Sequence, residues 1–176
     1  MTDTAPPAKS QATNVYDLLE DVCATILEEP RRYNQGEWGA VRGSQEWEYL
    51  PETLHPDCGT VGCRAGWIVV KADGAMPMRE EYGFAPRVNA ILVPHRASQI
   101  LGKLEAWTLL DNAREYERDI NALFDESALT IESNDDEFLP LKGSREYAER
   151  GVAGLRAFMT KWNTYLKSLP IAPLGK

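Results

Sequence analysis

Residues 61–72 limit the fold of this chain more than any other segment, because their side chains are apolar on nearly every side. The segment reads VGCRAGWIVVKA, and its two charged residues are Arg64 and Lys71. In a helix of 3.6 residues per turn these two residues, seven positions apart, share one face. A helix whose other faces are all apolar is stable only when neighbouring elements surround it. We therefore expect a central buried helix here, with one narrow exposed edge at Arg64 and Lys71. Thr60 is its expected N-cap and Gly74 its expected end.

A second helical stretch occupies residues 14–29. Apolar residues recur at helical spacing on one face, and acidic residues lie opposite them. Thr13 or Asn14 is the expected N-cap, and Pro30 ends the helix. Cys23 lies beside the apolar stripe, so we interpret it as a small core residue.

Two further stretches continue the helical pattern toward the C-terminus. The first covers residues 95–125 with a break near Gly102, and its segment 114–119, REYERD, is the expected solvated side. The second has Ser144 as its N-cap and carries an apolar stripe of several turns that Pro170 ends.

Together these stretches predict a mainly α-helical protein. We expect a single compact helical domain of about five helices, with a long aromatic-rich loop and little or no sheet. The chain has 176 residues, of which 43% are hydrophobic and 26% charged, as is usual for one soluble globular domain. Residues 14–169 are the expected domain, 1–13 a disordered lead and 170–176 a tail. A short extended piece is expected at residues 87–93.

The sequence shows none of the usual signals for membrane insertion or secretion. No apolar run approaches the ~20 residues needed to cross a bilayer. The start, MTDTAPPAKSQAT, lacks the basic and apolar regions of a secretory signal. Three cysteines without an export signal favour a reducing compartment, so we expect a cytoplasmic protein.

Residues 31–57 lack sustained periodicity and carry four aromatic side chains among glycines and prolines. These side chains are Tyr33, Trp38, Trp47 and Tyr49. A long loop with so many rings is expected to fold over the core. The alternative is a binding surface presented by the helical scaffold, for which these four residues are the candidates.

The segment HPDCGTVGC is the strongest candidate for a metal site. It offers His55, Cys58 and Cys63 as ligands. A structural zinc site takes four ligands, commonly as two closely spaced pairs, and here the second pair is missing. The remaining soft ligands, Cys23 and His95, are each isolated in the sequence. We therefore expect no metal and no cofactor.

A nucleophilic cysteine is the second chemical hypothesis for this segment. Cys63 falls in the first turn of the expected central helix, where amides and the helix dipole favour a thiolate. The base would have to be His55 or His95, the two histidines of the chain. The apolar neighbours of Cys63 would raise the pKa of its thiol if it is buried, so an inert core thiol is the favoured interpretation. A disulfide between Cys58 and Cys63 remains conceivable.

Acidic residues dominate the charge of the chain. The net charge is −8 and the isoelectric point about 4.9. Nucleic-acid binding needs a basic face that displaces counterions, so direct binding of nucleic acid is not expected. The acidic run from Glu132 to Glu137 lacks the ligand order and glycine turn of a calcium loop and is interpreted as a solvated turn.

The stretch CGTVGCRAGW at residues 58–67 resembles a signature of small uncharacterised proteins from bacteria and their phages. That signature is CGT, two residues, C, one residue, AGW. Three other stretches are similar to the family in the same order: ILEEPRRYNQGEW, RASQILGKL with NALFDES after it, and YAERGVAGLRAFM. Two features depart from the family pattern, since Arg64 replaces a usually apolar residue and the insert between ILGKL and NALF is longer. The resemblance implies a small helical domain of phage or mobile-element origin and supplies no activity.

The expected function is that of a non-enzymatic accessory protein, encoded by a phage or a bacterium, that binds another protein. The acidic charge suits a basic or nucleic-acid-associated partner, such as a host defence factor in the host cytoplasm. The alternative is a thiol- or zinc-dependent enzyme built on CGTVGC, residues 58–63.

Overall fold

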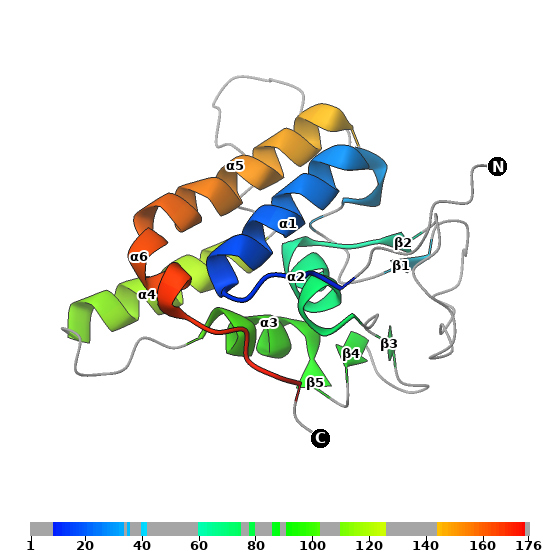
Figure 1. The fold of residues 1–176 in the computed structure, drawn as a ribbon. Helices are drawn as coiled ribbons and strands as arrows, with labels where there is room; N and C mark the ends of the chain where they lie inside the picture. The colour runs from blue at the N-terminus through cyan, green and yellow to red at the C-terminus, as the bar shows by residue number, and fades with distance from the viewer. Residues whose placement is uncertain are drawn as a thin grey trace.

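The structure is a computed structural model that describes residues 9–33, 35, 40–41, 60–74, 78–79, 86–88, 91–102, 110–125 and 144–174. These residues are mainly helical, which confirms the expected fold class (Figure 1). The α-helices are α1 (Val15–Glu28), α2 (Arg64–Asp73), α3 (Val93–Leu101), α4 (Leu110–Phe124), α5 (Arg145–Lys161) and α6 (Asn163–Ser168). A 3-10 helix, η1 (Pro30–Arg32), follows α1.

The described strands are two or three residues long and form two small antiparallel groups. They are β1 (Ala40–Val41), β2 (Thr60–Val61), β3 (Met78–Arg79), β4 (Pro86–Val88) and β5 (Ile91–Leu92). β1 pairs with β2, and β4 pairs with both β3 and β5, all antiparallel. The expected extended piece at residues 87–93 is thus partly present, and α3 begins earlier than expected, with Pro94 in its first turn.

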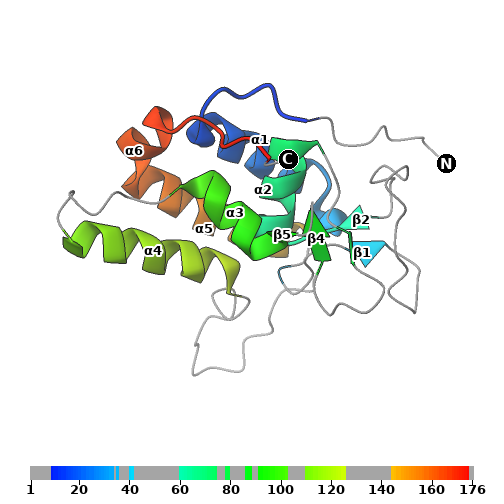
Figure 2. The ribbon, with the colours of Figure 1, turned by 90° about the horizontal axis from the view of Figure 1, so that it is seen from below.

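Helix α2 lies at the centre of the described elements, as its apolar composition requires. α1 and α5 run side by side along one side of it, and α3 packs against another. Figure 2 shows α2 and α3 between α1 and α4. Every residue of α2 from Arg64 to Val70 is buried, so the prediction of a central helix is confirmed. Fully burying one Val, Leu or Ile side chain contributes about 1.5–3 kcal/mol.

The start of α2 differs from the sequence prediction, whereas its end agrees. Thr60 is not the N-cap, because its backbone pairs with Val41 in the β1–β2 ladder. Cys63 is the N-cap instead, and the amide of Gly66 donates to its Sγ over 3.4 Å. At the other end Gly74 adopts the left-handed conformation with φ 69° and ends the helix, as predicted.

The expected exposed edge of α2 is also corrected, because Arg64 is only 2% exposed. Lys71, seven positions later, is half-buried. The elements around the first turn of α2 therefore enclose a cation that the helical pattern alone assigned to the surface.

Helix α1 follows its predicted pattern closely. Asn14 caps it, and its Oδ1 accepts a hydrogen bond of 2.9 Å from the amide of Asp17. The helix ends before Pro30, and Cys23 is fully buried, which confirms its interpretation as a core residue. The other buried residues of this face are Val15, Leu18, Leu19, Val22 and Ile26.

The break near Gly102 is confirmed, since that residue has φ 77° and caps α3. The solvated side predicted for residues 114–119 is wrong at Tyr116, which is 1% exposed and donates from its hydroxyl to the carbonyl of Leu101. Its ring meets Trp162 edge-on at 4.9 Å. The chain turns at Trp162, so the single last helix expected from the sequence is two helices, α5 and α6.

The segments before α1 and after α6 close against the domain. The amide of Ser10 donates to the carbonyl of Lys71 over 2.8 Å, and the amide of Val15 donates to Leu169 over 3.0 Å. Arg96, only 1% exposed, makes two bonds to the carboxylate of Asp73 and donates to the carbonyl of Ala172. The described parts of the expected lead and tail thus contact the helical core.

Candidate functional site

Cys63, the central candidate nucleophile and metal ligand, is fully buried at the junction of β2 and α2. Desolvation raises the pKa of its thiol to about 11, although amides of Gly66 and Ala65 bond to the sulfur and oppose the shift. At pH 7 a thiol with this pKa is ionised in roughly one molecule in ten thousand. Cys63 therefore serves as an N-cap and core residue and is a poor nucleophile.

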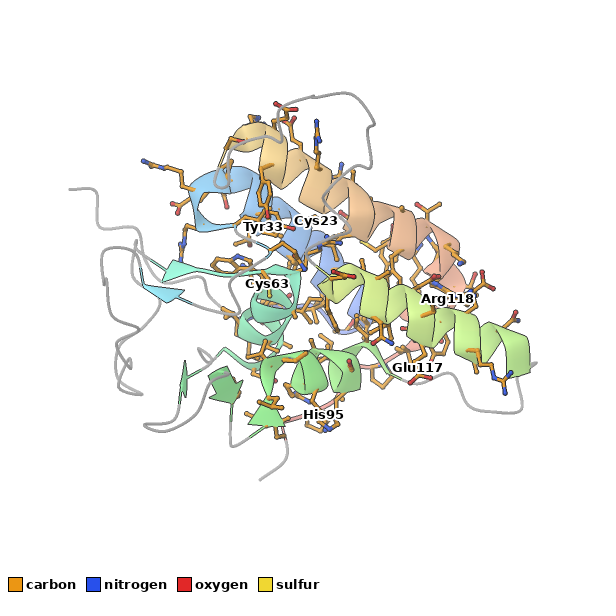
Figure 3. All side chains as sticks on the ribbon, turned by 180° about the vertical axis from the view of Figure 1, so that it is seen from behind. Cys23, Tyr33, Cys63, His95, Glu117 and Arg118 are labelled. Carbon is orange, nitrogen blue, oxygen red and sulfur yellow. The ribbon has the colours of Figure 1, made fainter. Side chains whose placement is uncertain are left out.

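The structure does not bring the proposed base to this thiol. His95 is exposed in the first turn of α3, and Figure 3 shows it well away from Cys63. His55 and Cys58 lie outside the described residues. Within the described ranges no three His, Cys, Asp or Glu side chains gather as a metal site would require.

Tyr33, one of the four binding-surface candidates, lies in the interior with no exposed area. Its ring packs on Tyr147 of α5, with ring centroids 5.4 Å apart, and it contacts Gly151 of the same helix. This residue therefore belongs to the core and not to an exposed surface. Trp38, Trp47 and Tyr49, as well as the acidic run at 132–137, lie outside the described residues.

A buried polar group, the Arg64 cluster, joins α2 to the chain that follows α1. Its members are Tyr33, Gln35, Arg64 and Tyr147. Oε1 of Gln35 accepts from the Tyr33 hydroxyl at 3.0 Å, from Arg64 Nε at 3.1 Å and from the Arg64 amide at 3.3 Å. Arg64 Nε also donates to the Tyr33 hydroxyl over 3.2 Å.

Gln35 extends the Arg64 cluster to two further helices. Its backbone amide donates to the hydroxyl of Tyr147 on α5 over 3.2 Å. Its side-chain Nε2 donates to the carbonyl of Leu123 in the last turn of α4 over 3.1 Å. One glutamine from a segment without helical pattern thus connects α2, α4 and α5, and sequence reasoning did not identify it.

The charge of Arg64 is not matched by a carboxylate within the described part of the chain. Its Nη2 is buried and has no hydrogen-bond partner. Burial raises the pKa of Tyr33 to about 12, although Arg64 nearby opposes the shift. Tyr33 thus stays neutral at physiological pH, and both acceptors on Arg64 Nε are neutral. An arginine in the first turn of a nearly apolar helix was the one sequence signal for this cluster.

The antiparallel β1–β2 pair fixes where the segment of residues 42–59 leaves and rejoins the domain. Val41 pairs with Thr60, and Ala40 pairs with Val61. β2 leads directly into α2, and the amide of Gly62 donates to the carbonyl of Arg32 over 2.9 Å. Val41 and Thr60, which flank this segment in the sequence, therefore lie side by side next to the start of the central helix. Residues 42–59 include Trp47, Tyr49, His55 and Cys58.

Comparisons with protein families, with curated proteins and with solved structures found no match to this chain. Among the described residues no helix has the length and apolar character that crossing a membrane requires.

Proposed function

We propose that this chain is a non-enzymatic accessory protein, encoded by a phage or a bacterium, that acts by binding another protein. The phage or bacterial origin rests on the resemblance of residues 58–67 to the CGT-x-x-C-x-AGW signature. The binding role rests on the β1–β2 pair, whose strands flank residues 42–59 in the sequence.

The observation that supports binding most directly is the β1–β2 pair at the base of residues 42–59. A segment whose two ends are fixed on a rigid scaffold loses less conformational freedom when it binds than one that hangs free. Its aromatic residues Trp47 and Tyr49 belong to the types that contribute most to protein interfaces. Loops that a rigid scaffold positions commonly carry binding residues.

The partner we propose is a basic or nucleic-acid-associated protein, with a host defence factor as the natural case for a phage protein acting in the host cytoplasm. The net charge of −8 would speed the encounter with a basic surface and would make it sensitive to salt.

The alternative, a thiol- or zinc-dependent enzyme on residues 58–63, is disfavoured by the burial of Cys63. A catalytic thiol needs a lowered pKa and access to its substrate. Cys63 has a pKa raised to about 11, no exposed surface, and a sulfur that caps α2.

A pull-down with the double variant Trp47→Ala/Tyr49→Ala tests the binding proposal. Tagged wild-type protein is incubated with bacterial lysate at low salt, and retained proteins are identified by mass spectrometry and then purified. We expect a basic protein that wild type retains, that elutes at high salt, and that the double variant loses. The matched control is Glu117→Ala/Arg118→Ala on the exposed face of α4, which leaves the net charge unchanged.

Direct titration of the purified partner completes the test. Removal of two interface aromatics should weaken binding by at least about 30-fold, because hot-spot side chains each contribute about 1–2 kcal/mol or more. Equal affinity of wild type and the double variant would contradict the assignment to residues 42–59. Failure of wild type to retain any protein would contradict the binding function.

A further inference from the structure

Arg64 is a buried cation whose hydrogen-bonding capacity is only partly used. A guanidinium carries five N–H donors and remains charged at any physiological pH. Among the described residues, the side-chain hydrogen bonds of Arg64 all come from Nε, which donates to the neutral oxygens of Tyr33 and Gln35. In the described residues nothing accepts from Nη2, which is shielded from solvent. A buried charge without a counter-charge is costly, and native proteins rarely keep one.

Arg96 shows how the same protein treats another buried arginine. It is 1% exposed, and the carboxylate of Asp73 bonds to its Nε at 2.9 Å and to its Nη2 at 2.6 Å. The carbonyl of Ala172 accepts a further bond from Nη2 over 2.7 Å. Arg96 is thus fully neutralised within the fold, whereas Arg64, equally buried, has no such group among the described residues.

One terminal nitrogen of Arg64, Nη1, lies against a glycine on the flank of α5. A Cβ at Gly154 would lie 3.0 Å from Nη1. Gly154 is half-buried, so the Nη1 end of Arg64 lies close to the surface of the domain. Arg150, one helical turn earlier, also lies on this flank and is half-buried. Its partner is the exposed Glu146 at 3.0 Å. Nη1 of Arg64 thus lies against a glycine of α5, one helical turn from a second arginine, in a protein of strongly negative net charge.

We propose that Arg64 is the inner part of a binding site for a small oxyanion ligand, a carboxylate or a phosphate, that reaches it past Gly154. The ligand oxygens would accept hydrogen bonds from Nη1 and Nη2, the geometry that a guanidinium offers to both groups. Tyr33 and Gln35 hold the guanidinium by its Nε and leave its outer edge to the ligand. The site is independent of the proposed protein binding through residues 42–59.

Isothermal titration of the purified full chain with inorganic phosphate and, separately, with malonate tests this site. Both titrations are done in chloride buffer at matched ionic strength, so that general screening is constant. We expect wild type to bind at least one of the two anions, and the tighter one assigns the ligand class. Arg64→Met should bind it at least about tenfold more weakly, since charge-assisted hydrogen bonds are lost. The matched control is Arg145→Met, which removes an exposed arginine of α5, the helix that carries Gly154.

Gly154→Ala gives a second test that leaves Arg64 in place. Alanine is a better helix former than glycine, so this variant is expected to fold. Its methyl group would lie 3.0 Å from Nη1 and narrow the approach, so it should also bind the anion more weakly than wild type. Weaker binding by Arg64→Met or Gly154→Ala, with Arg145→Met unchanged, supports the site. The proposed site would be overturned if wild type bound neither anion. It would also be overturned if all three variants weakened binding equally, because the anion would then be an adventitious ion only.

Discussion

The substitution Gly151→Ala should destabilise the fold, because the ring of Tyr33 fills the space that a side chain at residue 151 needs. A Cβ there would lie 2.4 Å from Cε1, Cζ and Oη of Tyr33. Favourable contacts between carbon atoms need about 3.5–4.0 Å. The ring cannot easily move away, since its hydroxyl bonds to Gln35 and Arg64 and the ring packs on Tyr147.

The size of the effect follows from two opposing contributions. Alanine is favoured over glycine in a helix interior by about 1 kcal/mol. Overpacking a core costs about 1–3 kcal/mol, and contact with three atoms of a fixed ring belongs at the upper end of that range. The net loss in free energy of unfolding is therefore about 2 kcal/mol. For a chain of this size the Tm should fall by roughly 4–8 °C.

Urea denaturation followed by far-UV circular dichroism measures this loss. Gly154→Ala is the matched control, because it makes the same change three residues later on α5. Among the described residues the new methyl group meets just the end of the Arg64 side chain, so stability should stay within about 1 kcal/mol of wild type. Equal urea midpoints for the two variants would refute the close contact between Tyr33 and α5.

The remaining predictions concern the buried arginines and thiols. Arg64→Met should leave stability unchanged or raise it by about 1–4 kcal/mol, because an unmatched buried charge is removed. Arg96→Met should lower it by about 3–5 kcal/mol, because the carboxylate of Asp73, 3% exposed, loses its partner. Urea midpoints measure both changes. A larger loss of stability for Arg64→Met than for Arg96→Met would contradict the interpretation that Arg64 is unmatched and Arg96 is matched by Asp73. Iodoacetamide at pH 7.5 should label neither Cys23 nor Cys63 in the folded protein and both in urea, as measured by mass spectrometry; fast labelling of either in the folded state would contradict its burial. Burial raises the pKa of each thiol from 9.0 to about 11. Because the pKa of each thiol is higher in the folded than in the unfolded state, its contribution to the free energy of unfolding is fully present below about pH 9. This contribution is lost as the pH rises toward 11, at up to about 1.4 kcal/mol per pH unit for each thiol. Urea midpoints that do not change between pH 8 and 10 would argue against both shifts.

The helices and several of their ends could be predicted from the sequence, because local chemistry determines them. Asn14 and Ser144 supply side-chain oxygens to the first turns of α1 and α5. Gly74 and Gly102 adopt positive φ at the ends of α2 and α3. The apolar composition of α2 placed it correctly at the centre.

The Arg64 cluster could not be predicted, because its partners come from distant parts of the chain. Gln35 is 29 residues from Arg64 and 112 from Tyr147. No periodic pattern marks Gln35 as a partner of Arg64. The helical pattern therefore assigned Arg64 to the surface. The cap at Cys63 was missed for a similar reason, since Thr60 is occupied by strand pairing with Val41. Pairing between segments that far apart has no local signal.

The packing of α1 against α5 has a consequence for synthesis on the ribosome. α1 (Val15–Glu28) is made before α5, which begins only at Arg145. At about 5–20 residues per second, the ribosome needs roughly 6–23 seconds to make the chain between the two helices. During that interval the apolar face of α1 lacks α5, one of the helices that pack against it. The nascent chain is therefore a natural substrate for chaperones, and a stop codon before α5 would release a product that exposes this face.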